Sequence, residues 1–116
     1  MKKKISIDRK EHELPYVCEH LGWKYHHTGI PVREKMEGEK YIPHLKIYVK
    51  GFKKSPFGIE WMRFEDDCPL HEMIKTKPHL AFVVEKLDDV LSTFDFNILS
   101  PPNAPSDGVR VAMIEY

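Results

Sequence analysis

The chain is short and electrically balanced. It has 116 residues, which is enough for one domain of ordinary size. Hydrophobic residues make up 41% and charged residues 31%, as is typical of a soluble globular protein. Eighteen basic residues cancel eighteen acidic ones. This balance argues against nucleic acid or an anionic membrane as the main partner, because both require clustered positive charge.

The sequence predicts a cytoplasmic protein. No apolar run approaches the ~20 residues that span a bilayer, and the lysines near the N-terminus are not followed by the apolar core of a signal peptide. Cys18 and Cys68 are too few for a disulfide framework, so both are interpreted as reduced thiols.

The first half of the chain predicts one helix and then three strands. A polar, frayed start over 1–9 is followed by a helix over about 10–21, because Leu14, Val17, Cys18 and Leu21 fall at helical spacing. Residues 33–40 are too polar and too short a segment for a packed helix and are predicted to be a loop. The strands predicted from alternation are Tyr25–Val32, His44–Lys50 and Phe57–Phe64.

The second half predicts a strand, a helix and two further strands. An acidic loop over 65–77, with a helical turn near Pro69–Ile74, precedes them. The segment Ser100–Gly108 is predicted to be a loop because its prolines cannot donate to a ladder. The predicted elements are a strand over His79–Val84, a helix over Leu87–Phe94, a brief strand over Asn97–Leu99 and a strand over Val109–Tyr116. Strands outnumber helices, so the predicted class is α+β with a mostly antiparallel or mixed sheet.

Two segments of the chain share one pattern, and each begins with a histidine. His27–Val32 aligns with His79–Val84, and both read His, any residue, a small residue, a large apolar residue, any residue, Val. The starts are 52 positions apart (79 minus 27). A repeat in so short a chain suggests two copies of one supersecondary unit. It would place two imidazoles at equivalent positions on two strands.

These histidines and one carboxylate form the candidate site. His27 shares its strand face with Gly29, and His79 shares its face with Ala81. Glu60 alternates with Ile59 and Trp61, so it points away from the apolar layer that those two residues are expected to form. Two histidines and a carboxylate suit a divalent ion such as Zn, Mn, Fe(II), Co or Ni. The alternative is that each histidine is only hydrogen-bonded or exposed.

Three segments of the chain resemble the vicinal oxygen chelate superfamily, which contains glyoxalases, bleomycin-resistance proteins and extradiol dioxygenases. They are His26–Val32, Gly58–Met62 and His79–Asp88. The resemblance implies a single glyoxalase-like domain over 1–116, with paired βαβββ modules curving around a divalent metal. Module one would cover about 24–64 and module two about 78–116, with the helix at 10–21 outside them. It implies His27, Glu60 and His79 as metal ligands, and frequent homodimers.

Two features depart from that pattern. Module one has only the polar loop 33–40 in place of a helix. Module two lacks its final strand, so the expected fourth ligand has no residue, and Glu115 is not its equivalent. Either the chain is truncated, or another subunit fills the slot and leaves no unpaired edge, or the site works with three ligands.

Three functions remain open. The first is a metal-dependent lyase or isomerase, similar to a lactoylglutathione lyase, in which Glu60 is a ligand or the catalytic base for a small oxygenated substrate. The second is a non-catalytic, resistance-type protein that binds a small molecule without metal. The third is a role in assembly through an exposed strand edge. The sequence does not identify the substrate, because specificity in such a fold depends on the shape of the cleft.

Overall fold

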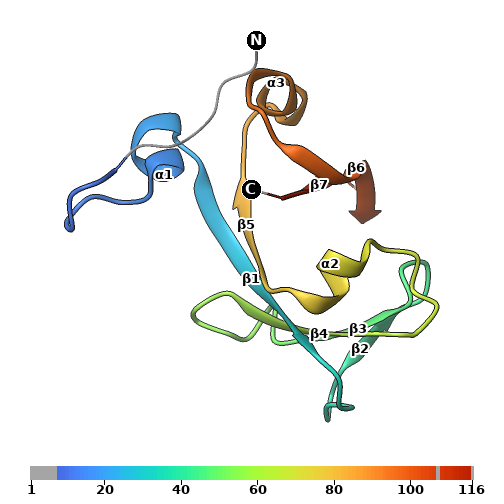
Figure 1. Cartoon of the computed structure of the whole chain (residues 1–116). Helices are drawn as coiled ribbons and strands as arrows, with labels where there is room; N and C mark the ends of the chain where they lie inside the picture. Colours follow the sequence, from blue (N-terminus) through green and yellow to red (C-terminus); the bar gives the residue numbers. More distant parts are fainter. Residues whose placement is uncertain (1–7, 107, 116) are drawn as a thin grey trace. The chain divides into compact units, whose positions relative to one another are not determined.

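A computed structural model describes residues 8–106 and 108–115 (Figure 1). Most of the segment predicted to be frayed, 1–9, lies outside the described residues. The described elements fall into two compact units, one from the described parts of Met1–Tyr25 and Phe82–Tyr116, the other from His26–Ala81. In chain order the elements are α1 (Tyr16–Leu21), β1 (Lys24–Val32), β2 (Lys40–Ile42), β3 (Ile47–Lys50), β4 (Ile59–Phe64), α2 (Glu72–Thr76), β5 (His79–Val83), α3 (Leu87–Thr93), β6 (Asn97–Ser106) and β7 (Val109–Glu115).

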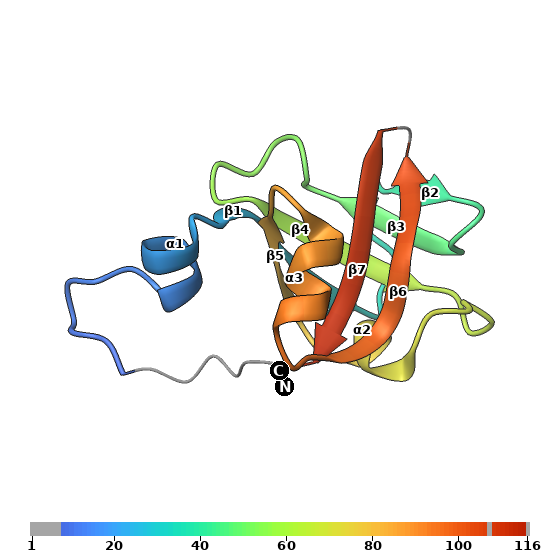
Figure 2. The same cartoon turned by 90° about the horizontal axis from the view of Figure 1, so that it is seen from above.

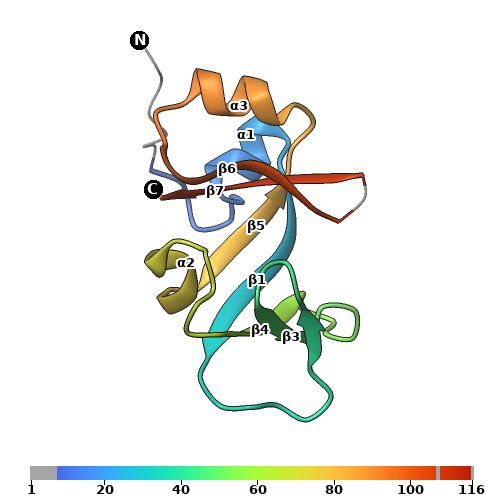
Figure 3. The ribbon, with the colours of Figure 1, turned by 90° about the vertical axis from the view of Figure 1, so that its right-hand side faces the viewer.

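A mixed five-stranded sheet runs in the order β2-β3-β4-β1-β5. β1 pairs with β4 in parallel, whereas β3 pairs antiparallel with both β2 and β4. Figure 3 shows the chain passing from β4 through α2 into β5. The predicted α+β class with a mixed sheet is therefore confirmed.

The connection between β3 and β4 sets the register of the site. Gly51 and Gly58 both adopt left-handed backbone, with φ of 100° and 71°, which glycine adopts at low cost. Between them, the Ser55 hydroxyl accepts hydrogen bonds from the backbone N–H groups of Phe57 (3.2 Å) and Ile59 (3.0 Å). The N–H of Thr28 then donates to the Gly58 carbonyl at 2.8 Å. This bond aligns the middle of β1 with the start of β4.

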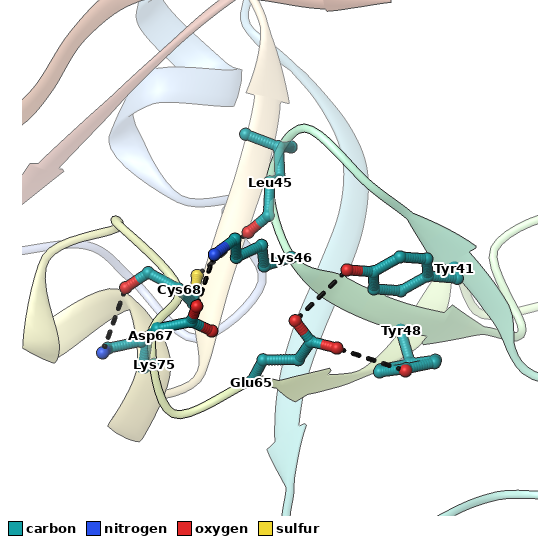
Figure 4. Close-up of polar contacts among 8 residues, drawn as sticks. All are labelled: Tyr41, Leu45, Lys46, Tyr48, Glu65, Asp67, Cys68 and Lys75. Atoms are coloured by element: carbon teal, nitrogen blue, oxygen red, sulfur yellow. Dashed lines mark hydrogen bonds and ion pairs between the residues drawn. The ribbon is translucent and has the colours of Figure 1, made fainter.

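The core of the His26–Ala81 unit lies on one face of β3 and β4. Ile47, Met62 and Cys68 are its buried members, and the Cys68 thiol donates to the Leu45 carbonyl at 3.1 Å (Figure 4). Around them pack the partly buried side chains of Ile42, Leu45, Val49, Phe64 and Leu70. Met62 is two residues from Glu60, so this apolar core shares the face of Glu60. The apolar layer expected from Ile59 and Trp61 is not the core, because both residues are only partly buried on the opposite face.

The unit that includes Phe82–Tyr116 contains a two-stranded antiparallel sheet of β6 and β7 (Figure 2). The prediction of a loop over Ser100–Gly108 is wrong, since β6 continues to Ser106. The ladder has register shifts, and its Cα partners on β6 are Asn97, Ile98, Ser100, Asn103 and Ser106. The prolines of this segment fall between those partners. They are tolerated because an irregular two-stranded ladder needs no N–H group at the skipped positions.

Other differences lie at element boundaries. α1 begins at Tyr16 rather than near residue 10 because Pro15 restricts the residue before it to extended backbone. β3 begins at Ile47 rather than His44, since Lys46 has a φ of 55° and belongs to a turn. The short strand β2 was not predicted. No helix forms between β1 and β2, where residues 33–39 are fully described.

Candidate functional site

The pairing of β1 with β4 brings Glu60 to the face of β1 that carries His27. Gly29 is the Cα partner of Glu60, and residues paired in a ladder point to the same side. His27 is two residues before Gly29 and shares that side. The His27 Nε2 and Glu60 Oε1 atoms are 4.0 Å apart, and the two side chains are 19% and 14% exposed.

His79, on β5, reaches the same group from the other side of β1. Its ring centroid lies 5.5 Å from that of His27, with the planes nearly perpendicular at 83°. The ring also covers Gly29, where an added Cβ would come within 2.1 Å of His79 Cε1. The imidazole therefore occupies the space that a side chain at position 29 would fill. The three residues singled out from the sequence lie together on one face of the sheet.

Burial shifts the pKa values of all three groups. Desolvation, then the neighbouring His79 and His26, lowers the pKa of His27 from 6.5 to about 4. Desolvation also lowers the pKa of His79 and raises that of Glu60. Both imidazoles are therefore neutral at pH 7, which is the form that binds a metal. The Glu60 carboxylate has no ion-pair partner other than neutral His27 among the described residues.

One atom of the site lacks a partner. His79 Nδ1 is buried, and no hydrogen bond reaches it in the described part of the chain. Buried nitrogen atoms of this kind are nearly always satisfied in native proteins, so an orphan needs an explanation such as an ion or a ligand. This orphan lies in a site whose other members are a neutral imidazole and a carboxylate.

Sequence analysis missed two residues of the site, His26 and Phe52. The Nδ1 atoms of His26 and His27 are 2.8 Å apart, so one of them carries a proton and donates to the other. The Phe52 ring lies 5.3 Å and 5.4 Å from the two imidazoles, centroid to centroid. The sequence holds a signal for His26, its adjacency to His27, but none for Phe52, which reaches the site from the turn after β3.

The hydrogen bond between His26 and His27 determines which nitrogen of His27 can bind a metal. When His27 Nδ1 donates to His26 Nδ1, the Nε2 of neutral His27 carries no proton and faces Glu60. A partner on the far nitrogen also orients an imidazole that ligates a metal. His26 is therefore a positioning residue for His27.

The site does not form a closed coordination shell as it stands. No group of three or more His, Cys, Asp or Glu side chains in residues 8–106 and 108–115 is arranged to hold a metal ion. His27 and Glu60 approach each other, whereas His79 contacts Gly29 and the edge of His27. Ligation by all three groups requires at least one of these side chains to move.

Two arginines form ion pairs with other residues. Arg63 pairs with Glu39, and Arg110 with Asp88 at 3.2 Å, so each arginine has an ion-pair partner. Cys18 is partly buried, whereas Cys68 is buried in the core beside Met62.

Comparison with known proteins assigns no family. No family model matches the chain, and no curated protein or solved structure is significantly similar to it. None of the described helices has the length and apolar character needed to cross a membrane. The function has to be argued from the site alone.

Proposed function

We propose that this chain is a glyoxalase-like member of the vicinal oxygen chelate superfamily, in which His27, Glu60 and His79 bind one divalent metal ion. Its reaction would be that of a lyase or isomerase on a small oxygenated substrate. The observation that carries the proposal is the buried Nδ1 of His79, which has no hydrogen bond among the described residues. Its ring packs against that of neutral His27, which in turn faces the Glu60 carboxylate.

The topology is compatible with two related modules. In the first half, β1 is followed by β2, β3 and β4, and the last of these returns to pair in parallel with β1. In the second half, β5 is followed by α3, β6 and β7. The proposal interprets these as one module without its helix and one module without its final strand.

The chemistry of the three groups suits proton transfer next to a metal. A bound divalent ion would polarise two neighbouring substrate oxygens and stabilise the negative charge that develops as a proton leaves carbon. Glu60 has a raised pKa because it is desolvated, and a higher pKa makes its carboxylate a stronger base. The His27 ring is hydrogen-bonded to His26, and its Nε2 lies 4.0 Å from the Glu60 carboxylate.

A second candidate function is binding of a small molecule without catalysis or metal. It is favoured by the lack of a closed group of ligands among the described residues and by Phe52, an exposed ring against the histidine pair. In that case the His79 Nδ1 would accept a hydrogen bond from the bound molecule.

The proposal also includes a homodimer in the cytoplasm. In the described structure β7 has only β6 as a neighbour, so one edge of β7 is open to another strand. Cys18 and Cys68 are free thiols, which suits a reducing compartment.

Two measurements test the proposal: titration with metal, monitored by isothermal calorimetry, and elemental analysis of the purified protein. The wild-type protein should bind about one equivalent of Zn²⁺ or Co²⁺, and His27→Ala or His79→Ala should weaken binding by 10-fold or more, as is typical of a lost ligand or outer-shell partner. His44→Ala, which removes an exposed histidine elsewhere, is the control and should leave affinity unchanged. Absence of metal binding in the wild type would leave only the second candidate.

Glu60→Gln separates the two roles of the carboxylate. If Glu60 is a ligand, the variant binds metal more weakly. If it is the base alone, the variant keeps its metal but no longer exchanges the α-proton of a substrate such as an α-hydroxyketone for deuterium.

A further inference from the structure

The opposite face of the sheet carries a second hollow, which the proposed metal site does not use. It is a shallow hollow, open to solvent, with a volume of about 650 Å³, and is lined by Val32, Arg33, Glu34, Lys35, Met36, Lys50 and Trp61. Ligand pockets in proteins commonly have volumes of this order. All of its residues belong to the His26–Ala81 unit. Trp61 alternates with Glu60 along β4, so this hollow and the candidate metal site lie on opposite faces.

The indole ring of Trp61 forms part of the lining of the hollow, and neighbouring residues pack against it. Lys50 is the Cα partner of Trp61 and lies beside it on the same face. The indole packs against Gly51, where an added Cβ would lie 2.8 Å from Trp61 Cζ3. Gly51 therefore lets the backbone approach one side of the indole, which leaves another part of the ring to line the hollow.

The wall of the hollow is the segment after β1, and it is held in place. The Glu39 carboxylate accepts a hydrogen bond from the Met36 N–H at 3.2 Å and another from Arg63 Nε at 3.1 Å. Arg63 in turn lies over the Tyr48 ring, 3.9 Å from its centroid. Through these contacts the segment carrying Arg33, Lys35 and Met36 is tied to the sheet. The backbone of this wall is thus preorganised, which lowers that part of the cost of binding.

Positive charge dominates the lining. Three cations, Arg33, Lys35 and Lys50, face one carboxylate, that of Glu34. Neither Arg33 nor Lys50 has an ion pair or a side-chain hydrogen bond in residues 8–106 and 108–115. By contrast, the next arginine on this face, Arg63, is neutralised by Glu39. An excess of cations above a flat ring attracts a ligand that has both an anionic group and an aromatic body.

We infer that this hollow binds a small aromatic carboxylate, whose ring lies on Trp61 and whose carboxylate is held by Arg33 and Lys50. The inference does not rest on the proposed metal function, because no residue is shared between the two sites. The guanidinium of Arg33 offers two parallel N–H donors, which matches a carboxylate better than a neutral amide.

Titration with 2-naphthoate tests the inference. The protein is first treated with a chelator and carries His27→Ala, so that the carboxylate cannot bind a metal on the other face. Trp23→Phe leaves Trp61 as the single tryptophan, whose fluorescence reports binding. We expect a dissociation constant below 1 mM, which corresponds to a favourable binding free energy of about 4 kcal/mol or more. Naphthamide, the neutral analogue, should bind at least 10-fold more weakly.

Charge variants locate the carboxylate. Arg33→Gln and Lys50→Gln should each weaken 2-naphthoate binding 5-fold or more without changing the circular dichroism spectrum, since both side chains are exposed. Lys53→Gln, an exposed lysine outside the lining, is the matched control and should have no effect. Equal binding of naphthoate and naphthamide, equal effects of Lys53→Gln and Lys50→Gln, or absence of binding below 1 mM would each overturn the inference.

Discussion

The imidazole ring of His79 packs against Gly29 and occupies the space that a side chain at position 29 would need. A Cβ at Gly29 would lie 2.1 Å from Cε1 and 2.5 Å from Nε2 of the His79 imidazole. Gly29 is buried in the middle of β1 and pairs with Glu60 on the neighbouring strand. The choice of glycine at this position therefore decides where the second histidine of the site can lie.

This fit predicts that Gly29→Ala displaces the His79 ring. Overpacking a tight contact costs about 1–3 kcal/mol, so urea denaturation should show a loss of that size. In a His79→Ala background the same Gly29→Ala change should cost much less, because the ring that it meets is gone. Equal costs in the two backgrounds would show that the imidazole does not occupy this space. Metal affinity, if present, should fall with Gly29→Ala alone.

The histidine at the centre of the site predicts a pH dependence of stability. The pKa of His27 falls from 6.5 to about 4 on folding, so the unfolded chain binds more protons between these values. The free energy of unfolding should therefore rise with pH from 4 to 6.5, by up to about 3 kcal/mol for this group. Denaturation across this range should show a flatter profile for His27→Asn, whereas His44→Asn should retain the wild-type slope.

Glu60 should have the opposite effect to His27 on how the free energy of unfolding depends on pH. Its pKa is raised in the folded protein because the carboxyl group is desolvated. The folded state then binds more protons above the ordinary value of 4.5, so this group makes stability fall as pH rises through that region. Glu60→Gln removes this contribution and should steepen the rise assigned to His27. A shallower profile in Glu60→Gln, measured in the same buffer without metal, would contradict the assignment.

The ion pair of Glu39 and Arg63 should contribute more than the exposed pair of Lys46 and Asp67. The Glu39 side chain is only 6% exposed and accepts bonds from both Arg63 and the Met36 backbone, whereas the Asp67 side chain is 69% exposed. Glu39→Gln should therefore lower the thermal midpoint further than Asp67→Asn. Differential scanning calorimetry of the two variants makes the comparison. Equal shifts would mean that the segment after β1 is not held by Glu39.

The two thiols should differ in reactivity. Cys68 is 5% exposed, and its Sγ donates to the Leu45 carbonyl inside the core with Ile47 and Met62. Cys18 is more accessible on α1. In native protein a thiol reagent should modify Cys18 at least 10-fold faster than Cys68, because a buried thiol reacts only after local opening. Cys18→Ser should abolish the fast phase, and its persistence would place the reactive thiol at Cys68.

The sequence predicted most strands, and it failed where local rules compete. Alternation identified β1, β4, β5 and β7 to within one or two residues. It failed at β6, where the prolines favour a loop and pairing with β7 overrides that preference. It also failed at α1, where helical spacing extends through Pro15 but the proline ring does not permit the helix to begin earlier.

For the site, the sequence by itself determined which side of each strand a residue faces. The two-residue period of a strand puts His27 with Gly29 and separates Glu60 from Trp61 without any knowledge of neighbours. Only the tertiary structure decided that Gly29 pairs with Glu60, that the His79 ring fills the place of a side chain at Gly29, and that Phe52 joins them. The physical reason is that strand pairing and side-chain packing join residues far apart in the chain, and no local pattern encodes which distant partner is chosen.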